Sequence, residues 1–393
     1  MSDPVVVASY ARTPIGGFQG VLSGLKSTEL GAEAVKAAVS RAGVAKDRID
    51  RVYMGCVLPA GLGQAPARQA ALGAGLPISA EATTINKMCG SGMQAAIMAH
   101  EALLAGSADV VVAGGMESMT NAPYALPKHR SGARIGHDRV IDTMMMDGLE
   151  DAYTPGKAMG AFAEDAVRDY QFTRAEQDAY ALRSLERANA AIKNGGFTKE
   201  IVPITLSTRA GKTVVDTDEQ PGNARPEKIP HLKPAFVPDG TITAANASSI
   251  SDGAAALVMT RRSVADKLGL PVVATVIGQA AHAHAPALFT TAPVPAIGKL
   301  LAKTGWKIDD VDLFEINEAF AVVAMIAAKD LNIPGEKLNV NGGATALGHP
   351  IGASGARIIA TLLGALENRG LKRGIASLCI GGGEATAMAF ELN

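Results

Sequence analysis

Cysteine is scarce in this chain of 393 residues, in which only Cys56, Cys89 and Cys379 are present. Their number is odd, and neither their density nor their spacing matches a disulfide framework or a zinc-binding knuckle. We therefore expect free thiols, a reducing compartment and no metal site.

Charge imbalance and long apolar runs are also missing. The 37 basic and 38 acidic residues give a formal net charge of −1, so no broad basic field is available for nucleic acid. No stretch of about 18 uninterrupted apolar residues occurs, and the first residues lack the basic and apolar regions of a secretory signal. We expect a cytoplasmic protein with no nucleic-acid or membrane partner.

Apolar sequence, in contrast, is plentiful. Hydrophobic residues make up 48% of the chain and charged residues 19%, which is ample for large buried cores. Short apolar runs alternate with helical segments, a pattern that predicts an α/β fold with largely parallel strands buried on both faces. The length allows two or three domains or one duplicated unit.

The chain also repeats itself. Residues 42–55 and residues 304–317 both read as a helix end, a turn and a strand. Further on, Cys89-Gly-Ser-Gly-Met93 matches Gly352-Ala-Ser-Gly-Ala356, and each segment opens an alanine-rich helix that leads into an apolar strand ending in glycines. These matches predict two homologous α/β units.

Between the repeats the composition changes. The segment is rich in proline, glycine and charge, and it contains one clear helix, which starts at Thr173 with a capping-box pattern and stops at glycines 195 and 196. We predict an inserted domain over residues 120–245. The N-terminal half then covers residues 1–119, with about 246–270 returning to it, and the C-terminal half covers residues 271–393.

Four motifs carry residues suited to covalent catalysis. Cys89 and Cys379 each lie in a glycine-rich turn, and between them come Asn317-Glu-Ala-Phe320 and Gly348-His-Pro350. A thiol nucleophile needs a base, and chemistry at the carbon beside a thioester needs a second acid/base. Cys89 falls at the start of a predicted helix, where backbone N–H groups favour an anion, so we expect its pKa to lie below the usual thiol value of about 8.5.

Together these motifs resemble those of the thiolase family of acyl-CoA C-acetyltransferases. The resemblance covers essentially the whole chain, from Ser9-Tyr-Ala-Arg-Thr-Pro14 to Cys379-Ile-Gly-Gly-Gly383, and it includes the segments 114–119, 232–236 and 246–254 in the family's order. It implies a thiolase-like fold, in which two duplicated α/β units form an αβαβα layered sandwich and an inserted loop domain covers the active site.

A role for each motif follows from the resemblance. Cys89 is the nucleophile that becomes acylated, and His349 activates it and donates to the thioester oxygen. Cys379 moves a proton at the α-carbon of the incoming acetyl group. Asn317 holds a water that, with His349, forms one oxyanion hole, and the N–H groups of Cys89 and Gly381 form the other. As an alternative to that role, Asn317 could cap a helix over residues 318–331.

The resemblance also implies a site for coenzyme A. Ser248 matches a family serine that contacts pantetheine, whereas Arg225 could either bind the nucleotide or be a solvated surface residue. The predicted apolar walls of the site are Met159, Phe236, Ala319 and Phe320. The implied substrates are acetyl-CoA, CoA and a 3-ketoacyl-CoA, with no metal or redox cofactor.

The implied reaction is the reversible Claisen condensation of two acetyl-CoA molecules to acetoacetyl-CoA and CoA, by a ping-pong route through acyl-Cys89. Acetoacetyl-CoA thiolases commonly carry His-Met-Gly where this chain has Ala158-Met-Gly160, which leaves the acyl-chain preference open. A degradative 3-ketoacyl-CoA or β-ketoadipyl-CoA thiolase would use the same residues. Cys379 argues against a decarboxylating ketoacyl synthase, and the four motifs argue against a non-catalytic acyl-CoA or lipid-binding relative.

Three other features receive structural interpretations. Cys56 lies in an apolar strand and is expected to be a buried core residue. His282 and His284 have the spacing of metal ligands on a strand, but no third ligand is evident. The glycine-rich runs lack the signatures of an ATP or NAD site.

The resemblance also implies association. Thiolases associate through such duplicated units, and the segment after Asn121 resembles the loop through which their tetramers form. We therefore expect a homo-oligomer, either a tetramer or a dimer.

Overall fold

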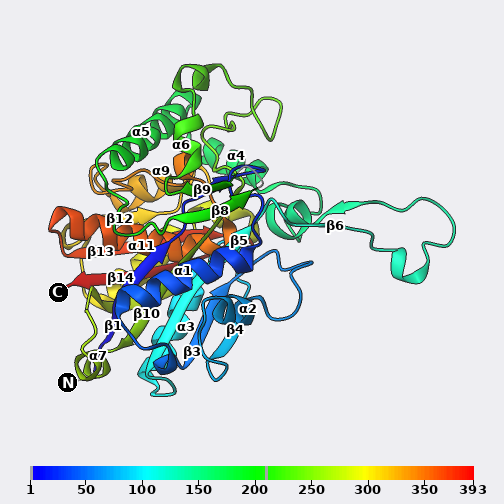
Figure 1. Ribbon diagram of the computed structural model, residues 1–393. Helices are drawn as coiled ribbons and strands as arrows, with labels where there is room; N and C mark the ends of the chain where they lie inside the picture. Colours follow the sequence, from blue (N-terminus) through cyan, green and yellow to red (C-terminus); the bar gives the residue numbers. More distant parts are fainter. Residues whose placement is uncertain (1–2, 209–210) are drawn as a thin grey trace.

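The computed structural model describes residues 3–208 and 211–393 (Figure 1). Ten strands form one continuous sheet: β1 (Val5–Arg12), β2 (Gly16–Gly17), β3 (Arg51–Gly55), β4 (Glu81–Ile85), β5 (Val110–Ser118), β10 (Ser251–Arg261), β11 (Ala274–Ala283), β12 (Leu313–Ile316), β13 (Arg373–Ile380) and β14 (Glu384–Leu392). Two further pairs make small hairpins: β6 (Tyr124–Ala125) with β7 (Ile141–Asp142), and β8 (Ile204–Thr208) with β9 (Gly211–Val215).

The α-helices of the described residues fall into two groups. Seven accompany the large sheet: α1 (Ser27–Ala42), α2 (Pro66–Gly73), α3 (Ser91–Leu104), α7 (Arg262–Leu268), α8 (Pro293–Thr304), α9 (Ala321–Leu331) and α11 (Ile351–Arg369). The others belong to the inserted segment or to the turn before His349: α4 (Met159–Tyr170), α5 (Arg174–Lys193), α6 (Glu219–Asn223) and α10 (Ala344–Leu347). No helix in the described ranges is long and apolar enough to span a membrane.

The large sheet consists of two equivalent halves. Its order is β12-β13-β14-β11-β1-β10-β5-β3-β4, and the halves meet where Val6 and Val7 of β1 pair with Thr275 and Ala274 of β11. Outward from this joint both halves begin with two antiparallel pairs followed by a parallel pair, and the N-terminal half adds a second parallel pair, β3 with β4. The predicted duplication is confirmed.

The prediction of largely parallel strands is wrong. β10 runs antiparallel to both β1 and β5, and β14 runs antiparallel to both β11 and β13. Continuous apolar sequence shows that both faces of a strand are buried, but it carries no information on strand direction. β14 reverses direction because it follows β13 through a tight turn in which Gly382 and Gly383 adopt positive φ.

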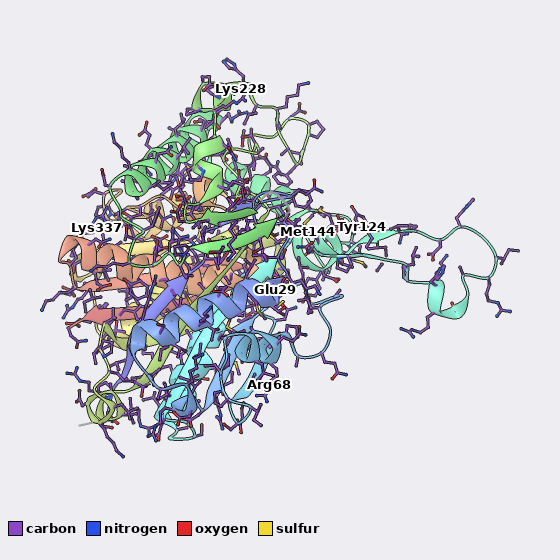
Figure 2. All side chains as sticks on the ribbon, viewed as in Figure 1. Glu29, Arg68, Tyr124, Met144, Lys228 and Lys337 are labelled. Atoms are coloured by element: carbon purple, nitrogen blue, oxygen red, sulfur yellow. The ribbon has the colours of Figure 1, made fainter. Side chains whose placement is uncertain are left out.

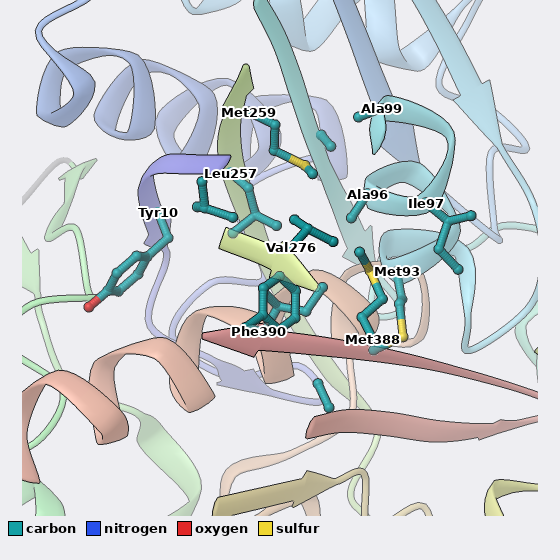
Figure 3. Packing of buried hydrophobic residues seen from close by; sticks show 14 of the residues in the cluster. Tyr10, Met93, Ala96, Ile97, Ala99, Leu257, Met259, Val276, Met388 and Phe390 are labelled. Carbon is teal, nitrogen blue, oxygen red and sulfur yellow. The ribbon is translucent and has the colours of Figure 1, made fainter. Parts of the chain in front are cut away.

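Three apolar cores separate the layers. One lies between the outer helices α1 and α2 and the N-terminal half of the sheet, and another lies between the outer helices α8 and α9 and the C-terminal half. The central core surrounds α3 and α11, and in Figure 3 Met93 of α3 lies beside Met388 of β14. The layers follow the order αβαβα, as the resemblance implied.

Helices α3 and α11 cross at glycines. A Cβ atom at Gly92 would lie 2.7 Å from the backbone nitrogen of Ala356, and one at Gly355 would overlap the backbone nitrogen of Met93. Both residues belong to the repeated Ser-Gly pair of the sequence. The absence of side chains at both positions therefore allows the two central helices to approach this closely.

The inserted segment lies between β5 and β10, and its described residues contribute no strand to the large sheet. Helix α5 begins as predicted, because Thr173 and Glu176 form a reciprocal capping box, and it ends at Lys193, just before the predicted glycines. The segment around β6 and β7 extends away from the body as an arm (Figure 1). Tyr124 and Met144 lie where this arm leaves the body (Figure 2). The exact domain boundaries remain a prediction.

Replacing Gly355 by alanine is expected to lower the stability of the protein by about 2 kcal/mol or more, because the new methyl group would force the central helices apart. The matched control is Gly298→Ala within α8, where a Cβ atom meets nothing within 4 Å. That change should be neutral or stabilise by about 0.5–1 kcal/mol. Urea unfolding measures both, and equal midpoints would show that the crossing does not require a glycine.

Candidate active site

Nine of the eleven predicted site residues line one cavity of about 400 Å³. They are Cys89, Met159, Phe236, Ser248, Ala319, Phe320, His349, Cys379 and Gly381. Asn317 lies behind His349, with its amide nitrogen 3.4 Å from the Nε2 atom of that ring. Arg225 lines a neighbouring cavity of about 290 Å³, which shares Ala244 and Ser249 with the first.

A tight turn presents Cys89 just before α3. Met88 adopts a φ of 46°, in the left-handed region that non-glycine residues rarely occupy. Its N–H donates to Asn86 Oδ1 at 3.0 Å, and its carbonyl accepts from Ser91 Oγ at 2.6 Å. A side chain at Gly90 would overlap Ile380. The two hydrogen bonds fix the bend at Met88, and the close approach at Gly90 places the Cys89 turn against Ile380, the neighbour of Cys379.

A second glycine-dependent turn presents His349 just before α11. Gly348 adopts a φ of 106°, and a side chain there would overlap Ser251. The N–H of His349 donates to the carbonyl of Ser249 at 3.1 Å. Because α3 and α11 cross near their N-terminal ends, the Cys89 and His349 turns reach the same cavity from different halves of the chain.

The His349 ring is buried, and its environment favours the neutral form. Nδ1 lies 2.5 Å from Ser354 Oγ, and the amide nitrogen of Asn317 lies 3.4 and 3.5 Å from the two ring nitrogens. Burial, reinforced by the positive charge of Arg357, lowers the pKa of His349 to about 3. A neutral imidazole at neutral pH can accept a proton, as a general base must.

The prediction of a lowered pKa for Cys89 is wrong. Burial raises the pKa of this thiol to about 11, and the carboxyl group of Glu117 adds to the shift, whereas the backbone N–H groups of Gly381 and Cys89 oppose it. The sulfur borders the cavity but is otherwise enclosed by protein, so the loss of hydration outweighs the helix terminus. Cys89 and His349 therefore rest as a neutral pair.

Cys379 lies at the end of β13, as predicted, and its thiol is almost completely buried. Burial and the nearby Cys89 raise the pKa of Cys379 well above the ordinary thiol range. The next turn brings the N–H of Gly381 to the Cys89 sulfur. The two cysteines and this N–H donor thus lie together in one cavity.

Asn317 does not cap a helix. Asn317 directly follows β12, and α9 begins only at Ala321, because Phe320 first pairs with Ala247 in an extended bridge. The amide oxygen of Asn317 accepts from Arg357 Nη2 at 3.2 Å, so its NH₂ group faces His349. The alternative of a simple N-cap is excluded.

Sequence reasoning missed the buried charges behind the site. Arg357 pairs with Glu315 at 3.0 Å, and both side chains are almost fully buried. A signal was present, because Arg357 is the one charged residue in residues 351–366 of an apolar helix and Glu315 interrupts an apolar strand. Two opposite charges isolated in apolar elements predict a buried pair.

Glu318 belongs to the Asn317-Glu-Ala-Phe320 motif, but the sequence did not predict its structural role. Its buried carboxylate accepts hydrogen bonds from Tyr180 Oη at 2.9 Å and Ser184 Oγ at 2.8 Å, both on α5. It also accepts from Asn339 and Thr345 in the segment that leads to His349. Glu318 thus ties the inserted segment to the turns that carry Asn317 and His349.

Aromatic rings form one wall of the cavity. The Phe320 ring packs edge to face against Phe236 at 5.7 Å and against Phe289 at 6.2 Å, although Phe289 was not predicted. The hydroxyl of Ser248 donates to the carbonyl of Ala319 at 2.9 Å. Its lone pairs remain available to accept a hydrogen bond from a ligand amide.

The remaining candidates lie outside the cavity. Cys56 is buried with its sulfur 3.6 Å from Glu117, and all three cysteines are free. The rings of His282 and His284 contact each other edge to face at 5.0 Å. Within the described residues, no group of three or more His, Cys, Asp or Glu side chains could hold a metal ion.

Comparison with known proteins agrees with this geometry. The model of the thiolase N-terminal domain matches residues 5–263, and that of the thiolase C-terminal domain matches residues 270–392. The chain is a member of the thiolase family. This thiolase is 51% identical to acetyl-CoA acetyltransferase 2 of Arabidopsis thaliana, over 99% of its own length and 97% of the relative's.

Two solved structures share the fold of this thiolase over essentially their whole length. The acetyl-CoA acetyltransferase of Bacillus anthracis superimposes with a TM-score of 0.96 at 42% identity, covering 100% of this chain and 99% of that one. The Acat5 thiolase of Ascaris suum, solved in complex with coenzyme A, gives a TM-score of 0.94 at 42% identity, covering 99% of this chain and 100% of that one.

The raised pKa of Cys89 predicts how its reactivity depends on pH. Because only the thiolate is alkylated, the rate of iodoacetamide modification should still be increasing at about pH 10, as expected for a pKa of about 11. Quantifying the modified Cys89 peptide by mass spectrometry separates it from the other two cysteines, and Cys89→Ala is the control. A rate that levels off by about pH 8 would show that the thiolate is already stabilised in the free enzyme.

Proposed function

We propose that this thiolase is an acetyl-CoA C-acetyltransferase, which condenses two acetyl-CoA molecules reversibly to acetoacetyl-CoA and CoA. The observation that carries the proposal is the convergence of Cys89, His349 and Cys379 on one cavity, beside the N–H of Gly381. Full-length relatives named acetyl-CoA acetyltransferase support the choice of substrate.

In the first half-reaction, Cys89 attacks the thioester carbonyl while its proton passes to His349. Because both groups are neutral at rest, the proton moves as the carbon–sulfur bond forms. The N–H groups of Cys89 and Gly381 donate to the oxygen of the tetrahedral intermediate. CoA then leaves with a proton from His349, and the acetyl group stays on Cys89.

In the second half-reaction, a second acetyl-CoA binds, the proton of the Cys379 thiol passes to His349, and the resulting thiolate removes a proton from the α-carbon of that acetyl-CoA. Protonated His349 and a water held by Asn317 then donate hydrogen bonds that stabilise the enolate oxygen. The α-carbon attacks the acetyl group on Cys89, the released sulfur takes the proton from His349, and acetoacetyl-CoA and the resting enzyme result. Thiolysis follows the same steps in reverse.

Coenzyme A is placed along the cavity wall in this proposal. Ser248 accepts a hydrogen bond from the pantetheine, whose apolar parts lie against Met159, Phe236 and Phe320. Arg225, together with Lys228 in the neighbouring cavity, faces the nucleotide phosphates. Burial of the apolar arm favours binding, whereas the exposed cations contribute mainly through long-range attraction.

The surroundings of the reaction centre favour an uncharged acyl group over a dicarboxylic one. A cavity of about 540 Å³ shares Met88, Met159 and Gly381 with the active site. Its lining includes three acidic residues, Asp147, Glu150 and Asp151. These carboxylates would repel the terminal carboxylate of a β-ketoadipyl chain.

Steady-state kinetics test the proposal. Wild-type protein should cleave acetoacetyl-CoA with CoA faster than it cleaves 3-ketohexanoyl-CoA or β-ketoadipyl-CoA. Cys89→Ala and Cys379→Ala should each lower kcat by about 10³-fold or more, because each removes a group that reacts directly. Cys56→Ala is a matched control, since this buried thiol lies outside the cavity.

Each other outcome has a definite meaning. Better turnover of a longer or acidic substrate would move the assignment to a degradative thiolase. Coenzyme A binding without turnover of any of the three substrates would indicate a non-catalytic relative. Full activity in either catalytic variant would contradict the two-cysteine mechanism.

We also propose a cytoplasmic tetramer, which is supported by the free cysteines and by the projecting arm. Tyr124, Ile135 and Val140 on this arm are 68%, 97% and 65% exposed, an unusual display of apolar surface. Light scattering should give a tetramer for the wild type and a dimer after residues 126–139 are replaced by a short glycine-serine turn. A monomeric wild type, or a tetramer without the arm, would contradict this assembly.

A further inference from the structure

The serine of each internal repeat holds one of the catalytic turns. Ser91 Oγ donates to the carbonyl of Met88 at 2.6 Å and accepts from the N–H of Lys87 at 2.9 Å, on either side of the bend that presents Cys89. Ser354 is its counterpart on α11. Its Oγ lies 2.9 Å from the carbonyl of Pro350 and 2.5 Å from Nδ1 of His349.

A neutral imidazole carries one proton, and only the other nitrogen can act as a base. Ser354 Oγ has a single proton of its own. When that proton is given to the carbonyl of Pro350, Oγ can only accept, and the donor facing it is Nδ1–H of His349. Nε2 then keeps its lone pair.

The other neighbours of the ring do not offer an acceptor. The amide nitrogen of Asn317 only donates, and it is turned toward His349 because Arg357 donates to the amide oxygen at 3.2 Å. Arg357 also places a positive charge behind the ring. Within the described ranges, Ser354 Oγ is thus the one side-chain acceptor in hydrogen-bond contact with the His349 ring.

Nδ1 and Nε2 also differ in what can reach them. Ser354 is completely buried and blocks Nδ1, whereas the ring as a whole borders the cavity that contains Cys89. A proton on Nε2 would leave the side of the ring that faces the reaction without a base. The position of one serine hydroxyl therefore determines whether the His349 ring can act as a base toward the cavity.

We propose that Ser354 is a positioning residue, which holds His349 as the tautomer protonated on Nδ1 and so leaves Nε2 to take the proton of Cys89. In that step the Sγ–H bond of Cys89 breaks, an Nε2–H bond forms, and the sulfur electron pair attacks the thioester carbon. This inference rests on the proposed function, in which Cys89 is the nucleophile.

Kinetics give one test. Ser354→Ala should lower kcat for acetoacetyl-CoA thiolysis by about 10- to 100-fold while KM changes by less than about 3-fold, because the ring loses its preferred tautomer but the binding walls stay in place. Ser354→Thr keeps the hydroxyl and should restore most of the activity. The matched control is Ser9→Ala on β1, a buried serine whose Oγ donates to the carbonyl of Ala38 at 2.6 Å.

The kinetic result would overturn the inference if Ser354→Ala matched Ser9→Ala within about 2-fold, or if the loss lay in KM alone. A wild type that does not cleave acetoacetyl-CoA would instead refute the proposed function. The two failures are therefore distinguishable.

Nitrogen NMR of the wild type tests the tautomer without relying on a variant that folds or on turnover. In protein labelled with ¹⁵N-histidine, the seven histidines give separate ring signals, and His349→Gln identifies the one of interest. The expected pattern is a protonated Nδ1 and an unprotonated Nε2 at neutral pH. A protonated Nε2, or a rapid average of both forms, would overturn the inference.

Discussion

Helices α3 and α11 cross at Gly92 and Gly355, and the arrangement of the active site depends on this close contact. The carbonyl of Gly352 also lies where side chains at Gly55 or Gly115 would stand, so strands from the N-terminal half press against the start of α11. The turns that carry Cys89 and His349 immediately precede these two helices. Close packing in the central layer thereby brings Cys89 and His349, the proposed nucleophile and base, to one cavity.

Burial, more than local charge, determines the protonation states in this centre. It raises the pKa of Cys89 and lowers that of His349, so neither group carries charge in the resting enzyme. A neutral pair avoids the cost of holding an ion pair in a poorly hydrated cavity. The N–H groups of Cys89 and Gly381 donate to the Cys89 sulfur in this state. In the proposed mechanism charge develops only when substrate is attacked, close to these donors.

The sequence predicted the parts of the site that repeat a local pattern. Glycine turns around Cys89 and His349, the strand end at Cys379 and the duplicated helices could all be read from neighbouring residues. The pKa of Cys89 could not, because hydration depends on residues from distant motifs. The contacts of Arg357 were missed for the same reason, since its partners Glu315 and Asn317 come from a distant strand and the turn after it. The contact of Ser354 with the nearby His349 was missed because it depends on how the turn before α11 bends.

The proposed mechanism depends above all on the covalent role of Cys89, and trapping the acylated enzyme reveals that role. Protein mixed with acetyl-CoA, quenched in acid and digested should carry one acetyl group on the peptide that contains Cys89. The same peptide should still be acetylated in Cys379→Ala, because that residue acts only in the second half-reaction. An acetyl group on Cys379, or none on Cys89 in a protein that turns over substrate, would contradict the mechanism.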